Sequence, residues 1–492
     1  MNPLKRLLGQ TAIYGLPTIV GRLLNYLLVP LYTLKFDAPK DYGVLSELYA
    51  WVAFLMVLLT FGMETAYFKY LNEKDDKQKV FQNSFLTVFG INILFLLVIL
   101  LFSPSIASAM MYPEHVEFFA ILGLNISIDA ASAIPLAKLR AENKAKKFAL
   151  IQSSSILTNI LLNLVVMFVL FDPAEPMEAI LFILIANLIS SLIKVVGTYK
   201  DFMSVRFVFD KTLGIEMAKY SFPLVIAGFA GIINETLDRA MMKPLLVRSG
   251  MSVDAALSQV GIYSACYKLA MIVTILLQAY RYAAEPFFFA QAKEQNANRV
   301  YAKIMNYFVA AMGIVFLGVS LNIDIFKHFI QSESYWVGLD VVPILLLANV
   351  FLGIYFNQSI WYKLSKQTKF GAYIALGGGA LTVAINFIFI PIYGFWASAW
   401  ATLIVYAAQM IASYLLGQKH YPIHYNLRKF GLYLGLALGL FFIAFGTNLD
   451  PGEFTWTKFA FHNGLIVFYV LVVWFLERTN NKVNITPEPQ SE

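Results

Sequence analysis

The sequence predicts an all-α polytopic membrane protein with about fourteen transmembrane helices. Its 492 residues are 59% hydrophobic and only 14% charged, against about 25% charged residues in a typical soluble domain, and its mean hydropathy is +0.66. Apolar stretches of about 20 residues, the length that a helix needs to cross a bilayer, recur along the whole chain. Lysine and arginine concentrate in alternate connections, as expected between membrane helices. Lipid is therefore the expected solvent for most of the chain.

The apolar stretches define the predicted spans. Each is too long for a strand of a membrane β-barrel, which has about 9–11 residues. The first seven spans are Thr11–Leu34, Gly43–Tyr70, Phe81–Phe102, Val116–Leu139, Phe148–Phe171, Ile180–Tyr199 and Tyr220–Met242. The last seven are Val260–Ala290, Tyr301–Ile323, Val341–Leu364, Phe370–Ile390, Phe395–Leu416, Phe430–Gly446 and Phe459–Leu476.

The cations between the spans predict the orientation. One set of alternate connections holds 26 lysines and arginines and the other set holds 6. The richer set is expected to be cytoplasmic, so both termini are predicted to lie in the cytoplasm. The first span has no small-residue cleavage site and is expected to stay in the mature protein. The five remaining cations lie within spans: Arg22, Lys194, Arg239, Lys268 and Arg281.

Composition also argues against several other functions. A single cysteine, Cys266, allows no intramolecular disulfide. His420 and His424 are separated by Pro422 and have no third ligand nearby, so no metal site is expected. The net charge of +7 reflects the inner side of a membrane rather than a nucleic-acid partner. No connection is long enough to form a catalytic domain, which argues against a membrane glycosyltransferase and against an enzyme in general.

The chain repeats itself. Tyr14–Pro17 at the first span resembles Tyr220–Pro223 at the seventh, and Tyr42–Tyr49 resembles Val260–Tyr267 in the next pair of spans. A third match aligns Lys146, Ala149 and Asn163 with Lys369, Ala372 and Asn386. Three matches in the same order predict two six-helix repeats related by an axis along the membrane normal, with the substrate between them. The expected domains are an N-terminal six-helix lobe (1–210), a C-terminal six-helix lobe (211–420), two additional spans (421–478) and a polar cytoplasmic tail (479–492).

Several motifs carry a resemblance to a known family. They are Asp41–Gly43, Gly62–Ala66, Val260–Ala265 and, most clearly, Asn386–Ala399, which contains Ile-Pro and Tyr-Gly pairs. With these motifs the chain resembles the polysaccharide transporter, or oligosaccharide flippase, family of the multidrug/oligosaccharidyl-lipid/polysaccharide (MOP) superfamily. The resemblance covers nearly the whole chain and implies two lobes arranged in a V, as in the MATE exporters.

The resemblance implies a function as well as a fold. Members of the polysaccharide transporter family move an undecaprenyl-diphosphate-linked oligosaccharide, such as a polysaccharide or O-antigen repeat unit, across the bacterial inner membrane by alternating access. A lipid II flippase and a cation-coupled multidrug exporter of the MATE type stay open as alternatives. Lipid-linked oligosaccharide, membrane lipid and other polysaccharide-assembly proteins are the expected partners. No cofactor is expected beyond a coupling ion, H⁺ or Na⁺, and a monomer is expected.

Cations inside the spans are the candidates for substrate binding, since a charged side chain there costs about 2.5–3.5 kcal/mol unless it faces a wet interior. Arg22 lies near the middle of the first span, and Lys268 lies in the equivalent of the second span in the other repeat. Together they are predicted to hold a diphosphate. By resemblance, Arg22 matches an arginine in the first helix of lipid II flippases. Asn25, Tyr267 and Arg281 complete the predicted substrate site.

Carboxylates in the spans are the candidates for ion coupling: Glu64, Asp129, Glu235 and Asp238. Glu64 has no partner at helical spacing. Arg281 with Glu285, and Arg239 with Glu235, are four residues apart and are predicted to form pairs on one helix face. Lys194, near the inner end of its span, is predicted to extend its ammonium to the membrane surface. Pro17 and Pro223 occupy equivalent positions in the two repeats and are predicted hinges.

Overall fold

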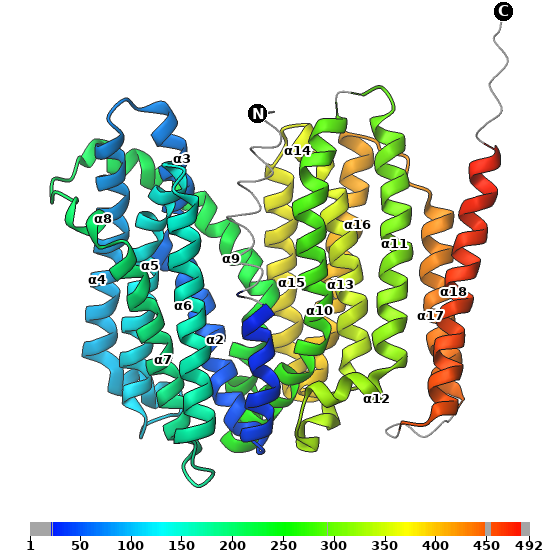
Figure 1. Cartoon of the computed structure of the whole chain (residues 1–492), viewed down its shortest axis with the longest axis horizontal. Helices are drawn as coiled ribbons and strands as arrows, with labels where there is room; N and C mark the ends of the chain where they lie inside the picture. The colour runs from blue at the N-terminus through cyan, green and yellow to red at the C-terminus, as the bar shows by residue number, and fades with distance from the viewer. Residues whose placement is uncertain (1–20, 22, 293, 448–453, 484–492) are drawn as a thin grey trace, which may run out of the picture. The chain divides into compact units, whose positions relative to one another are not determined.

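The computed structural model describes residues 21, 23–292, 294–447 and 454–483, and for 282, 283, 286, 290 and 479–483 it describes the backbone only. Within these residues the regular structure is entirely helical, and thirteen helices are long and apolar enough to cross a membrane (Figure 1). They correspond to thirteen of the fourteen predicted spans. Residues 23–35 are also helical, but most of the predicted first span lies outside the described residues.

The helices divide between two compact units. One runs to Ser264 and includes Gly379–Phe395; the other contains Ala265–Gly378 and continues from Trp396. The first unit therefore includes α9, which packs on α2, α3 and α4. The predicted lobe boundary at residue 210 concerns repeated sequence rather than packing and stays a prediction.

The first unit is built from long helices joined by short connections. It contains α2 (Pro39–Thr60), α3 (Met63–Glu73), α4 (Lys77–Ala109), α5 (Val116–Ala141), α6 (Ala145–Val165), a π-helical turn (Val166–Leu170), α7 (Pro176–Gly197), α8 (Tyr199–Met203) and α9 (Lys211–Arg248). The first part of α10 (Val253–Gln291) and the last part of α15 (Lys369–Tyr393) also belong to it.

The second unit contains the rest of α10 and α15. Its other helices are α11 (Ala297–Leu321), α12 (Ile323–Phe326), two short 3-10 turns (Lys327–Phe329 and Glu333–Gly338), α13 (Val341–Gln358), α14 (Ile360–Leu364), α16 (Phe395–His420), α17 (Leu427–Gly446) and α18 (Trp456–Val483). The last two, orange to red in Figure 1, lie side by side and pack on α11.

Local sequence explains where the helices begin and break. The side chains of Asp76, Asp210 and Asn426 cap α4, α9 and α17 by accepting hydrogen bonds from backbone amides of the first turn. The predicted span Gly43–Tyr70 is confirmed as Pro39–Glu73, but its helix is interrupted between α2 and α3. There Phe61 and Gly62 adopt left-handed φ values of 50° and 60°, a conformation that glycine tolerates without strain.

A very close helix crossing joins α2 to α10 within the first unit. A Cβ atom built on Gly43 would lie 2.0 Å from the carbonyl oxygen of Leu257, and one built on Gly261 would lie 1.9 Å from that of Pro39. Each glycine thus packs against the residue four positions before the other. Gly43 and Gly261 are equivalent positions of the two sequence repeats, so the repeated motif marks a symmetric backbone contact.

Candidate functional site

A pocket in the second unit gathers charged and aromatic side chains. Residues of α10, α13 and α14 line it, and its volume, including the open space at its mouth, is about 300 Å³. The predicted substrate residue Arg281 lines this pocket, together with Glu285, one helical turn further along α10, and Lys363 of α14. We call Arg281, Glu285 and Lys363, with the ring of Phe356, the cationic pocket.

The pairing inside the cationic pocket differs from the prediction. The Glu285 carboxylate binds the Lys363 ammonium at 2.5 Å, whereas the Arg281 guanidinium lies over the Phe356 ring at 4.1 Å from its centroid. The predicted pair of Arg281 with Glu285 is therefore wrong, because a cation from a neighbouring helix takes the carboxylate. Among the described residues, no carboxylate forms an ion pair with Arg281. Its N–H groups are available to an incoming anion.

The second unit also contains Lys268 and Tyr267. Tyr267 is buried, Lys268 is half-buried and both have partners within the structure. Thirteen residues separate Lys268 from Arg281 on α10, about 20 Å along the helix axis. The two cations therefore belong to separate places on one helix. Arg22, the predicted partner of Lys268, and Pro17 lie outside the described residues, so the diphosphate site predicted from Arg22 and Lys268 stays a prediction.

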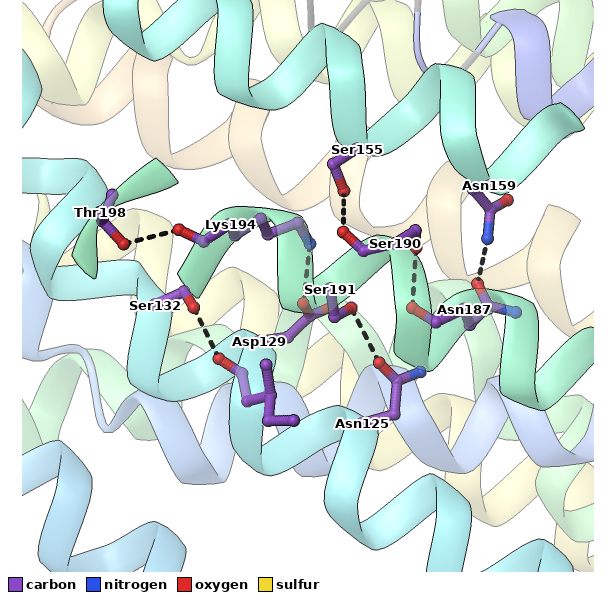
Figure 2. Close-up of polar contacts among 11 residues, drawn as sticks. Asn125, Asp129, Ser132, Ser155, Asn159, Asn187, Ser190, Ser191, Lys194 and Thr198 are labelled. Carbon is purple, nitrogen blue, oxygen red and sulfur yellow. Dashed lines mark hydrogen bonds and ion pairs between the residues drawn. The ribbon is translucent and has the colours of Figure 1, made fainter. Parts of the chain in front are cut away.

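The first unit has a polar interior between α5, α6 and α7 (Figure 2). The Lys194 ammonium binds the Asp129 carboxylate at 2.7 Å, and both side chains are partly buried. The charge of Lys194 is therefore neutralised by a neighbouring helix, and its predicted extension to the membrane surface stays a prediction. One turn deeper, Ser191 donates a hydrogen bond to the Asn125 side chain at 2.8 Å. Figure 2 shows these two pairs pointing toward one another across α5 and α7.

This polar interior continues as a ladder of uncharged side chains. Asn159 of α6 donates to the Asn187 side chain of α7 at 2.8 Å, and Asn187 donates to the hydroxyl of Tyr49 at 2.5 Å. Further along α6, the Tyr32 hydroxyl donates to Asn163 at 2.7 Å. Because these groups satisfy one another, the ladder holds helices together in lipid, where an unpaired polar group would be costly.

The other predicted carboxylates have separate surroundings. Glu64 binds Arg140 of α5 at 2.6 Å, a partner that helical spacing along α3 does not reveal. Buried Asp238 accepts a hydrogen bond from the Tyr263 hydroxyl at 2.6 Å. The predicted pair of Glu235 with Arg239 is wrong: Arg239 donates at 3.0 Å to the backbone carbonyl of Glu235 rather than to its carboxylate. The four candidates therefore do not form one site.

The remaining predicted site residues are on the surface of the first unit. Asn25 is exposed in the helix of residues 23–35, and Pro223 is exposed within α9. The helix continues through Pro223, so its role as a hinge stays a prediction. Within the described residues, no group of three His, Cys, Asp or Glu side chains is placed to hold a metal ion. The coupling ion, H⁺ or Na⁺, also stays a prediction.

Comparison with known proteins now identifies the family. Residues 7–291, more than half of the chain, match the model of the polysaccharide biosynthesis protein family. The chain belongs to this family. No curated protein matches the chain.

Solved structures of membrane transporters share the fold of this member of the polysaccharide biosynthesis protein family. The lipid II flippase MurJ in an inward closed conformation has a TM-score of 0.69 at 16% identity, over 95% of this chain and 99% of that one. The Vibrio cholerae MATE transporter VcmN has a TM-score of 0.55 at 12% identity, over 84% of this chain and 97% of that one. A MATE transporter in the straight conformation has a TM-score of 0.59 at 13% identity, with coverage of 83% and 95%. The predicted family and the predicted MATE-like helical fold are confirmed.

One buried ion pair of this family member is absent from the sequence-based prediction. The Lys243 ammonium of α9 binds the Glu47 carboxylate of α2 at 2.7 Å, and both side chains are almost wholly buried. The Tyr112 hydroxyl also donates to Glu47 at 2.6 Å, and Lys243 donates to the Met110 carbonyl at 2.6 Å. The sequence places Lys243 next to the end of a span, where a solvated lysine is the ordinary expectation. The one sequence signal for this buried pair was Glu47, an acidic residue inside the second predicted span.

Proposed function

We propose that the chain flips an oligosaccharide linked to a polyprenyl diphosphate, such as undecaprenyl diphosphate, from the cytoplasmic to the outer leaflet of the bacterial inner membrane. The supporting observation is the combination of family and fold: a member of a polysaccharide biosynthesis family is built as a multi-pass membrane transporter. A glycan that is assembled on a lipid inside the cell must cross the membrane. A transporter fold is suited to that step rather than to glycosyl transfer.

The charge of the cationic pocket supports an anionic cargo. Arg281 lies within the predicted span Val260–Ala290, ten residues before the end of α10. A cation within a span is costly unless water or an anion reaches it. With Lys363 and Glu285 the pocket has a net charge of +1, which favours a diphosphate and disfavours the organic cations that a drug exporter would carry. A guanidinium can also hold two phosphate oxygens at once.

The deciding experiment is a comparison of lipid extracts from cells that contain or lack this protein. We expect the cells without it to accumulate a polyprenyl-diphosphate oligosaccharide, and expression of the wild-type chain to remove the excess. The extracted lipid then identifies the cargo. Accumulation of lipid II would favour the peptidoglycan precursor, and unchanged lipids with increased sensitivity to cationic drugs would favour an exporter.

A second assay separates flipping from indirect effects on synthesis. The purified chain is reconstituted into vesicles with a fluorescent lipid-linked oligosaccharide, and the fraction of that lipid accessible to an added reductant is followed over time. We expect exchange between leaflets in vesicles that contain the chain and none in empty vesicles. Absence of exchange under an imposed H⁺ gradient, under an imposed Na⁺ gradient and without either would contradict the proposal.

A further inference from the structure

The connection between α7 and α9 in the first unit presents apolar side chains to its surroundings. Met203, Phe207 and Val208 are 83%, 78% and 69% exposed. We call these three residues the apolar tip. Side chains this apolar and this exposed are unusual in a short polar connection and commonly mark an interaction surface.

The apolar tip is held in a fixed direction. Val205, between its members, is buried in the core cluster of the first unit with Tyr67 and Phe81. Asp201 binds Lys138 of α5 at 3.0 Å, and the Ser204 carbonyl accepts a hydrogen bond from Gln78 at 3.2 Å. The connection therefore turns one side to the bundle and the other side, with the tip, outward.

Charges along the connection are sorted in the same way. Its acidic groups face the bundle: beside Asp201, Asp210 binds Lys79 at 2.5 Å. The hydrogen bonds from Lys79 and from the Leu213 amide lower the pKa of Asp210, so it stays ionised and bound there. The cations Lys200, Arg206 and Lys211 are exposed, and within the described part of the chain no carboxylate forms an ion pair with them. We call these three cations the basic rim.

The same surface continues onto α9. This helix has 38 residues, about 57 Å in length, against a hydrocarbon thickness of about 30 Å. The helix is therefore longer than the hydrocarbon, and its first turns precede the predicted span Tyr220–Met242. Ile215 and Phe222 are 45% and 56% exposed, and Lys219 lies on the same helix face. Apolar side chains and cations thus alternate from the tip toward the predicted span.

We propose that the connection between α7 and α9 is an interfacial membrane anchor: the apolar tip inserts at the boundary between headgroups and acyl chains, and the basic rim binds anionic phospholipid headgroups. Lipid is the expected occupant because the surface continues into the exposed apolar side chains of α9, which enters a candidate membrane span, and because its unpaired charges are all positive. A flexible, solvated connection would not need its apolar residues fixed outward. The anchor goes beyond the transport function and does not depend on which cargo is carried.

Spin labels on the full-length protein test this proposal. Cys266 is fully buried, so a new surface cysteine can be labelled selectively in the folded chain. One label is placed by Phe207→Cys, and a matched control by Asp75→Cys in the exposed connection between α3 and α4. The labelled proteins are reconstituted into phosphatidylcholine vesicles with or without phosphatidylglycerol. Collision rates are measured with oxygen, which concentrates in the bilayer, and with a water-soluble nickel chelate.

Insertion predicts opposite behaviour of the two labels. We expect the oxygen-to-nickel collision ratio at position 207 to exceed that at position 75 by about threefold or more, since a side chain at this boundary lies about 5–10 Å below the headgroups. Equal ratios would show a solvated connection and overturn the proposal. Protection of position 207 from both reagents would show that protein covers the tip, which overturns it as well.

The electrostatic part has its own control. Phosphatidylglycerol should raise the ratio at position 207, and neutralising the basic rim with glutamine should abolish that increase. Neutralising Lys144, Lys146 and Lys147, at the start of α6 (Ala145–Val165), should leave the increase unchanged. If both triple variants behave alike, or if phosphatidylglycerol has no effect on the wild-type chain, the basic rim does not bind anionic lipid.

Discussion

The crossing of α2 and α10 gives the sharpest quantitative prediction. In Gly261→Ala, the new methyl group would lie 1.9 Å from the Pro39 carbonyl oxygen, whereas ordinary van der Waals contact begins at 3.4 Å. The two backbones must therefore separate by about 1.5 Å. Overpacking typically costs about 1–3 kcal/mol, and the upper end applies here because the obstacle is backbone, which cannot change rotamer. The higher helix propensity of alanine offsets up to about 1 kcal/mol of this cost. The free energy of unfolding is therefore expected to fall by about 2 kcal/mol.

Thermal unfolding of the purified protein measures this loss. Cys266 is the one cysteine of the chain, and it is buried, so a dye that fluoresces on reacting with a thiol reports unfolding directly. Gly90→Ala in α4 is the matched control, because a Cβ there meets nothing within 4 Å. It should leave the melting temperature unchanged or raise it.

The symmetry of the contact adds a second test. Gly43→Ala should destabilise to a similar extent, since its Cβ would lie 2.0 Å from the Leu257 carbonyl oxygen. The double variant should lose less than the sum of the single losses, because one separation of the helices accommodates both methyl groups. If Gly261→Ala unfolds at the same temperature as Gly90→Ala, the helices do not touch at this point and the reasoning is refuted.

Three further predictions follow from charge. Replacing Arg281 with glutamine should slow flipping of a diphosphate-linked lipid about tenfold or more per folded molecule, whereas Glu285→Gln, which frees Lys363, should preserve or increase it; equal losses would point to a structural pocket. Arg22→Lys should retain more transport than Arg22→Ala, because a guanidinium binds two phosphate oxygens at once, and wild-type activity of the alanine variant would remove Arg22 from the site. Reporter fusions test the orientation, and any two reversals would refute it: fusions at Lys77, Lys146 and Lys366 should report cytoplasm, and fusions at Pro113 and Pro173 the outside.

The span pattern was predictable because lipid imposes it on every residue of a helix. Helix α5 begins at the predicted residue and ends two residues after the predicted span. Helix α17 begins three residues before the predicted span and ends at the predicted residue. The interruption at Phe61 was not predictable from hydropathy, since it depends on a backbone conformation rather than on polarity. The part of α9 before Tyr220 was also missed, because the polar residues there can continue a helix beyond the predicted span.

The charge partners were less predictable than the charges. Helical spacing finds a neighbour on the same helix, but Glu285, Glu64 and Lys194 each bind a partner on another helix. A long side chain can reach an adjacent helix as easily as the next turn of its own. Within lipid, the pairing is decided by which helices pack together, and this information lies between segments far apart in the sequence. Candidate charged residues can therefore be found from sequence, whereas their pairing cannot.

The buried pair of Glu47 and Lys243 joins helices close to one of the family motifs, Asp41–Gly43. A fully buried ion pair repays its loss of hydration only when its remaining polar atoms are also bonded, as Tyr112 and Met110 provide here. Glu47 lies one turn after Gly43 on α2, so the close helix crossing and the buried pair are adjacent. Both are packing devices that join α2 to other helices, and neither presents a free group to a substrate. The Asp41–Gly43 motif and the buried pair beside it therefore account for helix packing, and they bear on the fold more directly than on the cargo.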